Sequence, residues 1–225
     1  MFAALQSEIG QRISASGMYF DAISPPPSTP PAPPHSSPGS LPVQIAKGTM
    51  FVLLYAVYEY AVNEVFRAAL TEVRKHRLQF KNTRLELLSL GLHPEITAAI
   101  TCGPKRTWET RIALFLRSAA AVDFDAADDV FPADGSHYRQ EQLETLWRIF
   151  GLSPPAIPHP RYGTLIDELV ENRNAIAHGR RTADDVGSGY SPADIRRKIT
   201  ETQDLCFHLC SELQLHCSVA ANITR

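Results

Sequence analysis

A long apolar repeat dominates the first half of this 225-residue chain. Between about Ala46 and His76, apolar side chains recur every three or four positions, at Phe51, Leu54, Tyr55, Tyr58, Val62, Val65, Phe66 and Leu70. This interval matches the turn of an α-helix and predicts one long amphipathic helix.

The rest of the chain is also typical of helices. Shorter helices are expected at 83–90, 94–101, 106–120 and 138–150, with an irregular acidic loop at 123–135. A further helix should begin with Thr164 as its N-cap and end at His178, with Gly179 in a left-handed conformation. The last helix should run from Ser191, which opens a capping arrangement, to about Cys217. Because no run alternates apolar and polar residues, the sequence predicts an all-α bundle.

A proline-rich segment divides the chain near its start. Nine of the 17 prolines lie between Ser24 and Pro42, where they prevent a helix and favour an extended spacer. Its PxxP pattern is also that of ligands for aromatic grooves, although a plain linker is the simpler interpretation. We expect an N-terminal helical appendage at 1–23, a linker at 24–45, the main helical domain at 46–218 and a tail at 219–225.

Composition narrows the class of protein. The longest apolar stretch, Met50 to Tyr58, is too short to cross a bilayer, and no secretory signal opens the chain, so a cytoplasmic protein is expected. Four cysteines without a regular spacing do not predict disulfides. The formal charge of −2 gives no overall attraction to nucleic acid, so RNA binding requires a local basic surface.

The helix expected before Gly179 changes character along one face. Ile166, Val170, Asn174 and His178 share one ridge, and Leu169 and Arg173 lie on the ridge beside it, because positions four apart are about 40° apart around a helix. The face therefore begins apolar and ends in a guanidinium, an amide and an imidazole. Unpaired charge is costly in a core, which favours a functional role for these groups.

The stretch Arg173-Asn-Ala-Ile-Ala-His178, followed by Gly179, resembles the signature of the HEPN superfamily. Leu54 to Glu59 also resembles the first core helix of prokaryotic HEPN proteins. The resemblance spans about 46–217 and implies a HEPN-like helical bundle. Many HEPN domains are metal-independent ribonucleases, so it implies Arg173, Asn174 and His178 as catalytic residues without metal or cofactor.

The residue types suit that chemistry. RNA cleavage without a metal needs a group that moves protons and a cation that meets the charge on the phosphate. An imidazole titrates near neutrality, and a guanidinium holds phosphate oxygens through a fixed fork of donors. His178 and Arg173 are these groups, and Asn174 can orient either the imidazole or a phosphate oxygen.

Helix geometry bears on assembly. Arg173 and His178 are five positions apart, about 140° around a helix, so one chain does not bring both onto one phosphate. Two motif helices across a two-fold axis would pair each Arg with the partner's His. The family resemblance implies such a homodimer. The alternative is that both residues pair with core acids such as Glu59 and only stabilise the fold.

Other residues are weaker candidates. Glu59 is a supporting carboxylate that can position Arg173, or a member of a solvated edge. Arg180 and Arg181 are candidate RNA-binding residues and form a candidate phosphate-binding patch with the basic cluster at 196–198, although charged loops are usually only solvated. Tyr162 is a candidate for stacking a base, or a residue that packs at the helix entry.

A metal site is not expected. Cys206 and Cys210 suggest zinc ligands with His208, but on a helix His208 projects away from them, which favours buried thiols. The sequence therefore predicts a metal-independent endoribonuclease acting on RNA as a homodimer, of the kind used as a toxin or antiviral effector and neutralised by an antitoxin. The alternative is a noncatalytic HEPN-like module that binds RNA or protein.

Overall fold

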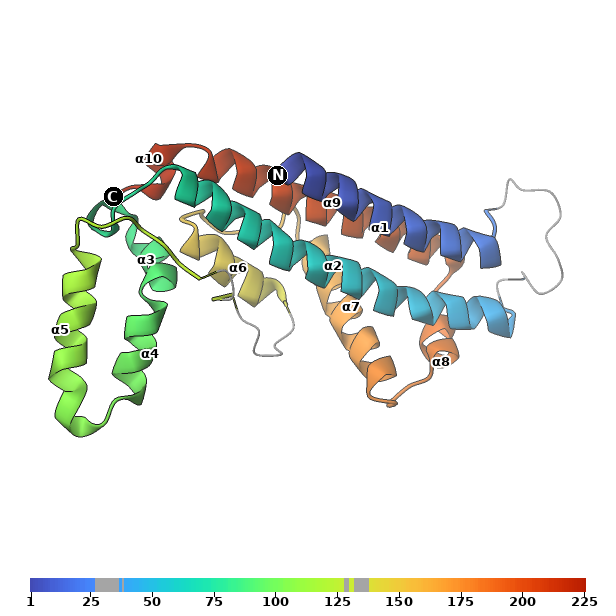
Figure 1. Ribbon diagram of the computed structural model, residues 1–225. Coiled ribbons are helices and arrows are strands. Elements are labelled where there is room, and N and C mark those ends of the chain that lie inside the picture. Colours follow the sequence, from blue (N-terminus) through green and yellow to red (C-terminus); the bar gives the residue numbers. More distant parts are fainter. Residues whose placement is uncertain (27–36, 38, 128–129, 132–137) are drawn as a thin grey trace. The chain divides into compact units, whose positions relative to one another are not determined.

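The computed structural model describes residues 1–26, 37, 39–127, 130–131 and 138–225, and helices joined by loops make up most of this part (Figure 1). The α-helices are α1 (Phe2–Ile23), α2 (Leu41–Lys75), α3 (Leu85–Gly91), α4 (His93–Thr101), α5 (Thr107–Ser118), α6 (Gln140–Ile149), α7 (Arg161–Ala177), α8 (Ala183–Ser188), α9 (Pro192–Cys217) and α10 (Ala220–Ile223). Two isolated bridges are the only β-type pairings in these residues. The prediction of an all-α fold is confirmed.

The chain divides into two compact units. Residues 1–64 and 157–210 form most of the first unit, and residues 65–127, 141–156 and 211–225 form most of the second. The long helices α2 and α9 each contribute to both.

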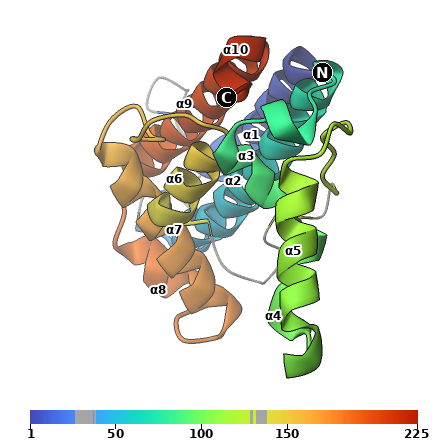
Figure 2. The same cartoon turned by 90° about the vertical axis from the view of Figure 1, so that its left-hand side faces the viewer.

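In the first unit, α1 lies beside the first part of α2 and beside α9 (Figures 1 and 2). Its apolar face is buried at Phe2, Leu5, Ile9, Ile13 and Phe20. Arg196 of α9 binds Asp21 at 2.8 Å, and Arg12 lies 3.8 Å from the centroid of the Tyr60 ring. The helix expected to be an appendage therefore packs as part of this unit.

Helices α2 and α8 approach each other closely enough to require glycine. A Cβ on Gly48 would lie 1.9 Å from the carbonyl oxygen of Ala183, and one on Gly187 would lie 1.9 Å from that of Gln44. Both contacts are with backbone, which cannot move aside. The short helix α8, which the sequence pattern did not predict, is thus held against α2.

In the second unit, aromatic side chains form the core. Phe66 packs against Phe131 and Phe150, with ring centroids 6.2 and 5.6 Å away, and Phe80 packs against Phe124. Helices α4 and α5 form a pair of neighbours (Figure 2) in which no residue is fully buried.

Several expected boundaries shift. Helix α2 begins at Leu41, inside the expected linker, and the polyproline-like spacer falls mostly outside the described residues, as does part of the expected acidic loop. Helix α7 begins at Arg161 after Pro160, so the prediction that Thr164 is its N-cap is wrong. The capping arrangement of α9 is confirmed, because Asp194 and Ser191 exchange hydrogen bonds of 3.0 and 3.1 Å.

Helix α2 is long and apolar enough, by length and composition alone, to cross a membrane. However, 56% of its most apolar stretch is buried inside the protein, and the core helix of a globular domain has the same character.

Candidate active site at the end of helix α7

Helix α7 carries the Arg-Asn-x3-His motif at its C-terminal end. Its first part buries apolar side chains such as Leu165, Ile166, Leu169 and Val170, which fixes the helix in the first unit. The buried face continues into Asn174, which is 9% exposed. Of the three polar residues expected to continue this face, Asn174 is therefore buried on it, whereas His178 is exposed.

A left-handed residue ends α7. Gly179 has φ +66°, and the amide of Arg180 donates to the carbonyl oxygen of Ala175 at 2.8 Å, the bond of a Schellman turn. The chain reverses there, and Arg180 and Arg181 return beside the last turn of the helix. The left-handed conformation predicted for Gly179 is confirmed.

Arg173 is held on an aromatic ring. Its guanidinium carbon lies 5.1 Å from the centroid of Tyr55, and its Nη1 donates to Asn174 Oδ1 at 3.0 Å. No carboxylate lies within ion-pair distance of Arg173 in the described residues. The expectation that Arg173 pairs directly with a core acid is therefore wrong in this structure, and its donors retain capacity for an added anion.

Glu59 contacts this group indirectly. The Tyr55 hydroxyl donates to Glu59 Oε1 at 3.3 Å, and Asn63 Nδ2 donates to the Glu59 carbonyl oxygen at 3.0 Å. Burial, followed by the charge of Glu59, raises the pKa of the Tyr55 phenol, which keeps that hydroxyl a donor. Glu59 thus fixes Tyr55, the ring on which Arg173 lies.

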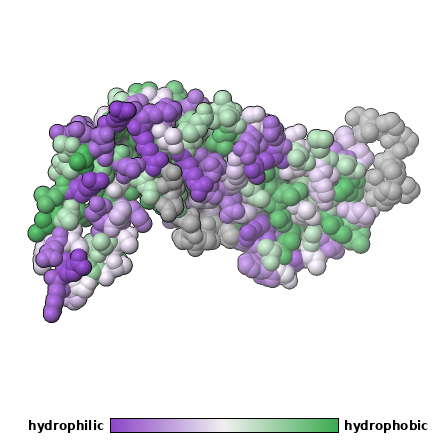
Figure 3. Space-filling view, viewed as in Figure 1, coloured by the Kyte–Doolittle hydropathy of each residue, from purple (hydrophilic) through white to green (hydrophobic). Residues whose placement is uncertain are grey.

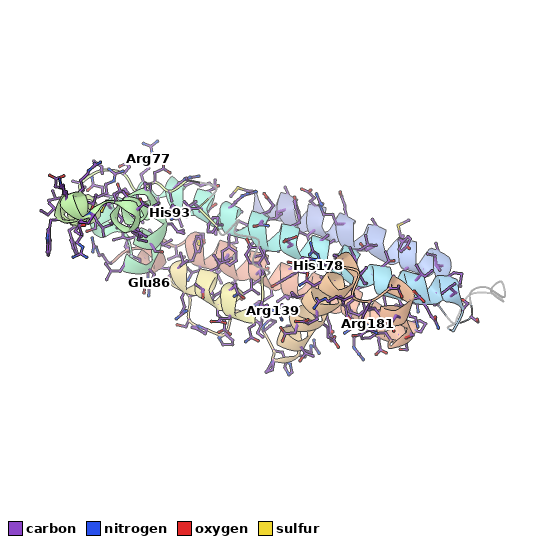
Figure 4. All side chains as sticks on the ribbon, turned by 90° about the horizontal axis from the view of Figure 1, so that it is seen from below. Arg77, Glu86, His93, Arg139, His178 and Arg181 are labelled. Carbon is purple, nitrogen blue, oxygen red and sulfur yellow. The ribbon has the colours of Figure 1, made fainter. Side chains whose placement is uncertain are left out.

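His178 is exposed at the end of α7, where it is the C-cap residue. Its backbone amide donates to Asn174 at 3.0 Å, whereas its imidazole has no hydrogen bond or ion pair within the described part of the chain. Figure 4 labels His178 together with Arg139 and Arg181, two arginines of the same unit. The ring is therefore accessible to a ligand.

Arg173 and His178 do not bond to each other. Arg173 faces Tyr55 of α2, while the His178 ring is solvent-exposed, as their offset of about 140° on a helix requires. Within one chain, the cation and the imidazole stay on different sides of the helix end.

Acidic residues of α7 and α8 pair with two arginines of this unit. Arg139 bridges Asp167 at 2.8 Å and also binds Glu171, and both acids lie on α7. Arg181 pairs with Asp185 at 2.7 Å. Arg139 and Arg181 are therefore already neutralised, which weakens the attraction of this unit for phosphate.

The candidate RNA-binding residues differ in their exposure and in their partners. Arg180 is exposed, and its guanidinium has no partner among the residues that the structure describes. Arg181 is exposed but paired with Asp185. Tyr162 is only 4% exposed and packs at the first turn of α7, so its ring offers little surface on which a base could stack. Stapling of the helix entry, the alternative interpretation, matches this position.

The basic cluster at 196–198 is likewise used internally. Arg196 pairs with Asp21 and Arg197 with Asp194, each at 2.8 Å, and the ammonium of buried Lys198 binds Glu168. These residues stabilise the first unit and do not form an open phosphate-binding patch.

A cavity of about 290 Å³ opens beside the motif, and the sequence pattern did not reveal it. It is lined by Glu171, Asn172, Ala175, Arg180 and Arg181. In the sequence, Asn172 is an ordinary polar position next to the motif, and the turn at Gly179 brings Arg180 and Arg181 back to the last turns of α7. That turn was predicted, but the cavity that it forms with α7 was not.

The cysteines of α9 are core residues. Cys206, Cys210 and Cys217 are fully buried and unbonded, and burial raises the pKa of Cys210 and of Cys217 to about 12. In the described part of the chain, no three His, Cys, Asp or Glu side chains gather as metal ligands would.

A family model described as RiboL-PSP-HEPN matches residues 32–214, which include the whole motif helix. No curated protein and no solved structure matches the chain.

Proposed function

Because the chain belongs to the RiboL-PSP-HEPN family, for which a nuclease or other RNA-related role is indicated, we propose that it is a metal-independent endoribonuclease. The observation that carries this proposal is the exposed His178 imidazole, free of partners in the described residues, at the end of a helix that also presents Arg173. A histidine in such a position is accessible to a substrate, and an imidazole can both accept and donate a proton.

The proposed reaction is attack by a 2′-hydroxyl on the adjacent phosphorus. One imidazole accepts the hydroxyl proton while the O2′–P bond forms. The same imidazole, protonated by that transfer, then gives the proton to O5′ while the P–O5′ bond breaks. The products are a 2′,3′-cyclic phosphate and a 5′-hydroxyl, and His178 is the residue proposed for both proton transfers.

Arg173 is proposed to stabilise the charge that develops on the phosphate oxygens. Its guanidinium is already oriented by the Tyr55 ring and by Asn174 Oδ1, so little ordering remains when a phosphate binds. Asn174 then acts on Arg173 rather than on His178, and Glu59 positions Tyr55. Asn174 and Glu59 are thus positioning residues in this proposal.

A homodimer is proposed to complete the site, with Arg173 of one protomer beside His178 of its partner. The separation of the two side chains within one chain supports this arrangement. HEPN domains often act on RNA and dimerise.

Mixing two inactive variants tests this proposal. Arg173→Ala and His178→Ala each remove one half of the composite site, but a mixed dimer keeps one complete site. Subunit exchange at equal concentrations should restore about a quarter of wild-type cleavage, because half of the dimers are mixed and each has one site. Inactivity of the mixture, with dimers formed, would contradict the shared site, and Arg161→Ala mixed with His178→Ala controls for a nonspecific effect of dilution.

We further propose that the activity is cytoplasmic and belongs to a toxin or antiviral effector that a protein antitoxin neutralises. Expression of the wild-type chain should then arrest growth, and His178→Ala should relieve the arrest at the same expression level. Equal toxicity of both would contradict a role for cleavage.

A noncatalytic module that binds RNA or protein is the second candidate. The pairing of Arg139 and Arg181 with nearby acids, together with the formal charge of −2, favours it. In that case Arg173→Ala and His178→Ala should leave RNA products and cell growth unchanged while dimers persist.

A further inference from the structure

The cavity beside the motif is lined by a buried amide whose oxygen accepts no hydrogen bond from the described residues. Asn172 is 8% exposed, and its Nδ2 donates at 3.0 Å to both the Glu168 carbonyl oxygen and the Tyr190 hydroxyl. A carbonyl oxygen can only accept, so the amide orientation is fixed and Oδ1 points the other way. Oδ1 has no partner in the described residues and is not sealed off from solvent, which leaves it at the cavity wall.

The wall behind Asn172 is rigid. The Tyr190 ring lies 4.7 Å from Phe51, its carbonyl oxygen accepts from Lys47 Nζ at 2.6 Å, and its hydroxyl meets Asn172. Buried Lys198, bound to Glu168, lies 5.4 Å from the centre of the Tyr190 ring. An acceptor held by such a network is preorganised, so binding of a ligand carries little entropic cost for ordering it.

A cation also lines the cavity. The turn at Gly179 brings the Arg180 guanidinium to the cavity, where it has no partner in the part of the chain that the structure describes. Arg181 also lines the cavity, but its charge is already paired with Asp185. Glu171, positioned by Arg139, adds a carboxylate, and Ala175 adds a small apolar surface.

These groups match one kind of ligand. A volume of about 290 Å³ is near the lower limit for small-molecule sites, which suits one flat ring. Guanine offers donors at N1 and N2 and acceptors at O6 and N7, and arginine binds O6 and N7 through its fork. Uracil and cytosine each have fewer N–H donors than guanine to offer to Asn172 Oδ1 and the Glu171 carboxylate. Adenine lacks the O6 acceptor that an arginine would bind.

We propose that this cavity binds a guanine base of the RNA, with Asn172 Oδ1 and the Glu171 carboxylate accepting from N1 and N2 and with Arg180 donating to O6 or N7. Glu171 and His178 are seven positions apart and share a helix face, about two turns from each other. The base therefore belongs to a nucleotide that flanks the cleaved bond. The inference rests on the proposed endoribonuclease function.

Binding of uncleavable RNA separates this inference from the cleavage itself. The probes are fluorescein-labelled 2′-O-methyl heptanucleotides of uridine with guanosine, adenosine, cytidine or uridine at the centre, which lack the attacking hydroxyl. Fluorescence anisotropy with the full chain should give a Kd about tenfold lower for the guanosine probe than for the other three.

Two variants assign that preference to the cavity. Arg180→Ala changes an exposed side chain and should not affect the fold. It should reduce the Kd preference for the guanosine probe by about threefold or more. Asn172→Ala should do the same, with circular dichroism checking that its network survives. Arg197→Ala, which removes another exposed arginine of the same unit, is the charge-matched control and should keep the preference.

Each result decides the inference. Equal Kd values for the four probes, a preference for another base, no binding of any probe, or a guanosine preference unaffected by Arg180→Ala would overturn it. Cleavage of RNA without guanine selectivity would leave the endoribonuclease proposal standing alone. Selective binding without cleavage of natural RNA would support the cavity and contradict the enzyme.

Discussion

Helices α7 and α5 have similar sequence patterns but different environments. Both are amphipathic, yet α7 buries Ile166 and Leu169 completely, whereas Ile112 and Phe115 of α5 are 58% and 72% exposed. Figure 3 shows apolar side chains on the surface over α5. Apolar periodicity therefore predicts that a helix has an apolar face, but the partner that covers that face must be read from the structure.

The contrast extends to polar groups. The buried polar side chains around α7, among them Asn172, Asn174 and Lys198, are each fixed by a specific partner. Helix α5 has no buried residue at all. A region that fixes polar groups without filling every donor and acceptor has the character of a binding site.

The largest expected difference lies in the apolar faces themselves. Ile166→Ala should lower the free energy of unfolding by about 2–5 kcal/mol, because it opens a cavity among fully buried neighbours. Ile112→Ala, the matched change in α5, should alter it by less than about 0.5 kcal/mol. Urea denaturation measures both, and equal losses would show that α5 is covered in solution.

The buried ion pair beside α7 gives the next effect. Glu168→Gln leaves the ammonium of Lys198, which is 5% exposed, without its carboxylate, and should cost about 2–4 kcal/mol, since part of Glu168 is solvated. Glu141→Gln, at an exposed site, is the control. Adding Lys198→Met to Glu168→Gln should recover most of the lost stability, because the unpaired ammonium is removed. Failure to recover would mean that the lost stability does not come from the unpaired Lys198.

A pH effect distinguishes the second unit. Burial, and then Arg84, lower the pKa of His216, while a backbone bond at Phe150 opposes them, so the folded chain favours the neutral ring. As the pH falls below about 6.5, the unfolded chain takes up the proton first and stability declines. His216→Gln should reduce that decline by a few tenths of a kcal/mol, allowing for solvent screening. His93→Gln, the control, should leave the decline unchanged. Identical pH profiles of stability for wild type and His216→Gln would contradict the assignment of the decline to His216.

The smallest expected effect is a difference in the quenching of tryptophan fluorescence. Trp108 of α5 is 72% exposed and Trp147 of α6 is 3% exposed. Acrylamide should quench the fluorescence of Trp147→Phe, which retains Trp108, several-fold more than that of Trp108→Phe. Similar quenching of the two variants would mean that a second molecule covers α5.

The sequence predicted what depends on local periodicity and capping. The long helix α2, the cap at Ser191 and the left-handed Gly179 follow from spacing and residue type, and the structure contains all three. The start of α7 did not follow, because tertiary packing of Tyr162 extends that helix beyond the favourable cap at Thr164.

The site was predictable only in part. Arg173, Asn174 and His178 stand out because polar groups continue an apolar face. The support of Arg173 by Tyr55, the neutralisation of Arg181 and the orientation of Asn172 by Tyr190 each join residues distant in sequence or depend on side-chain geometry. No local pattern records such contacts.

The most direct test of the account is the initial rate of RNA cleavage in EDTA by wild type, His178→Ala and His93→Ala, with product ends identified. The account predicts 2′,3′-cyclic phosphate ends, a rate about 100-fold or more lower for His178→Ala, and a wild-type rate for His93→Ala, an exposed histidine of the second unit. Equal cleavage by all three proteins, or no cleavage by folded wild type, would contradict it.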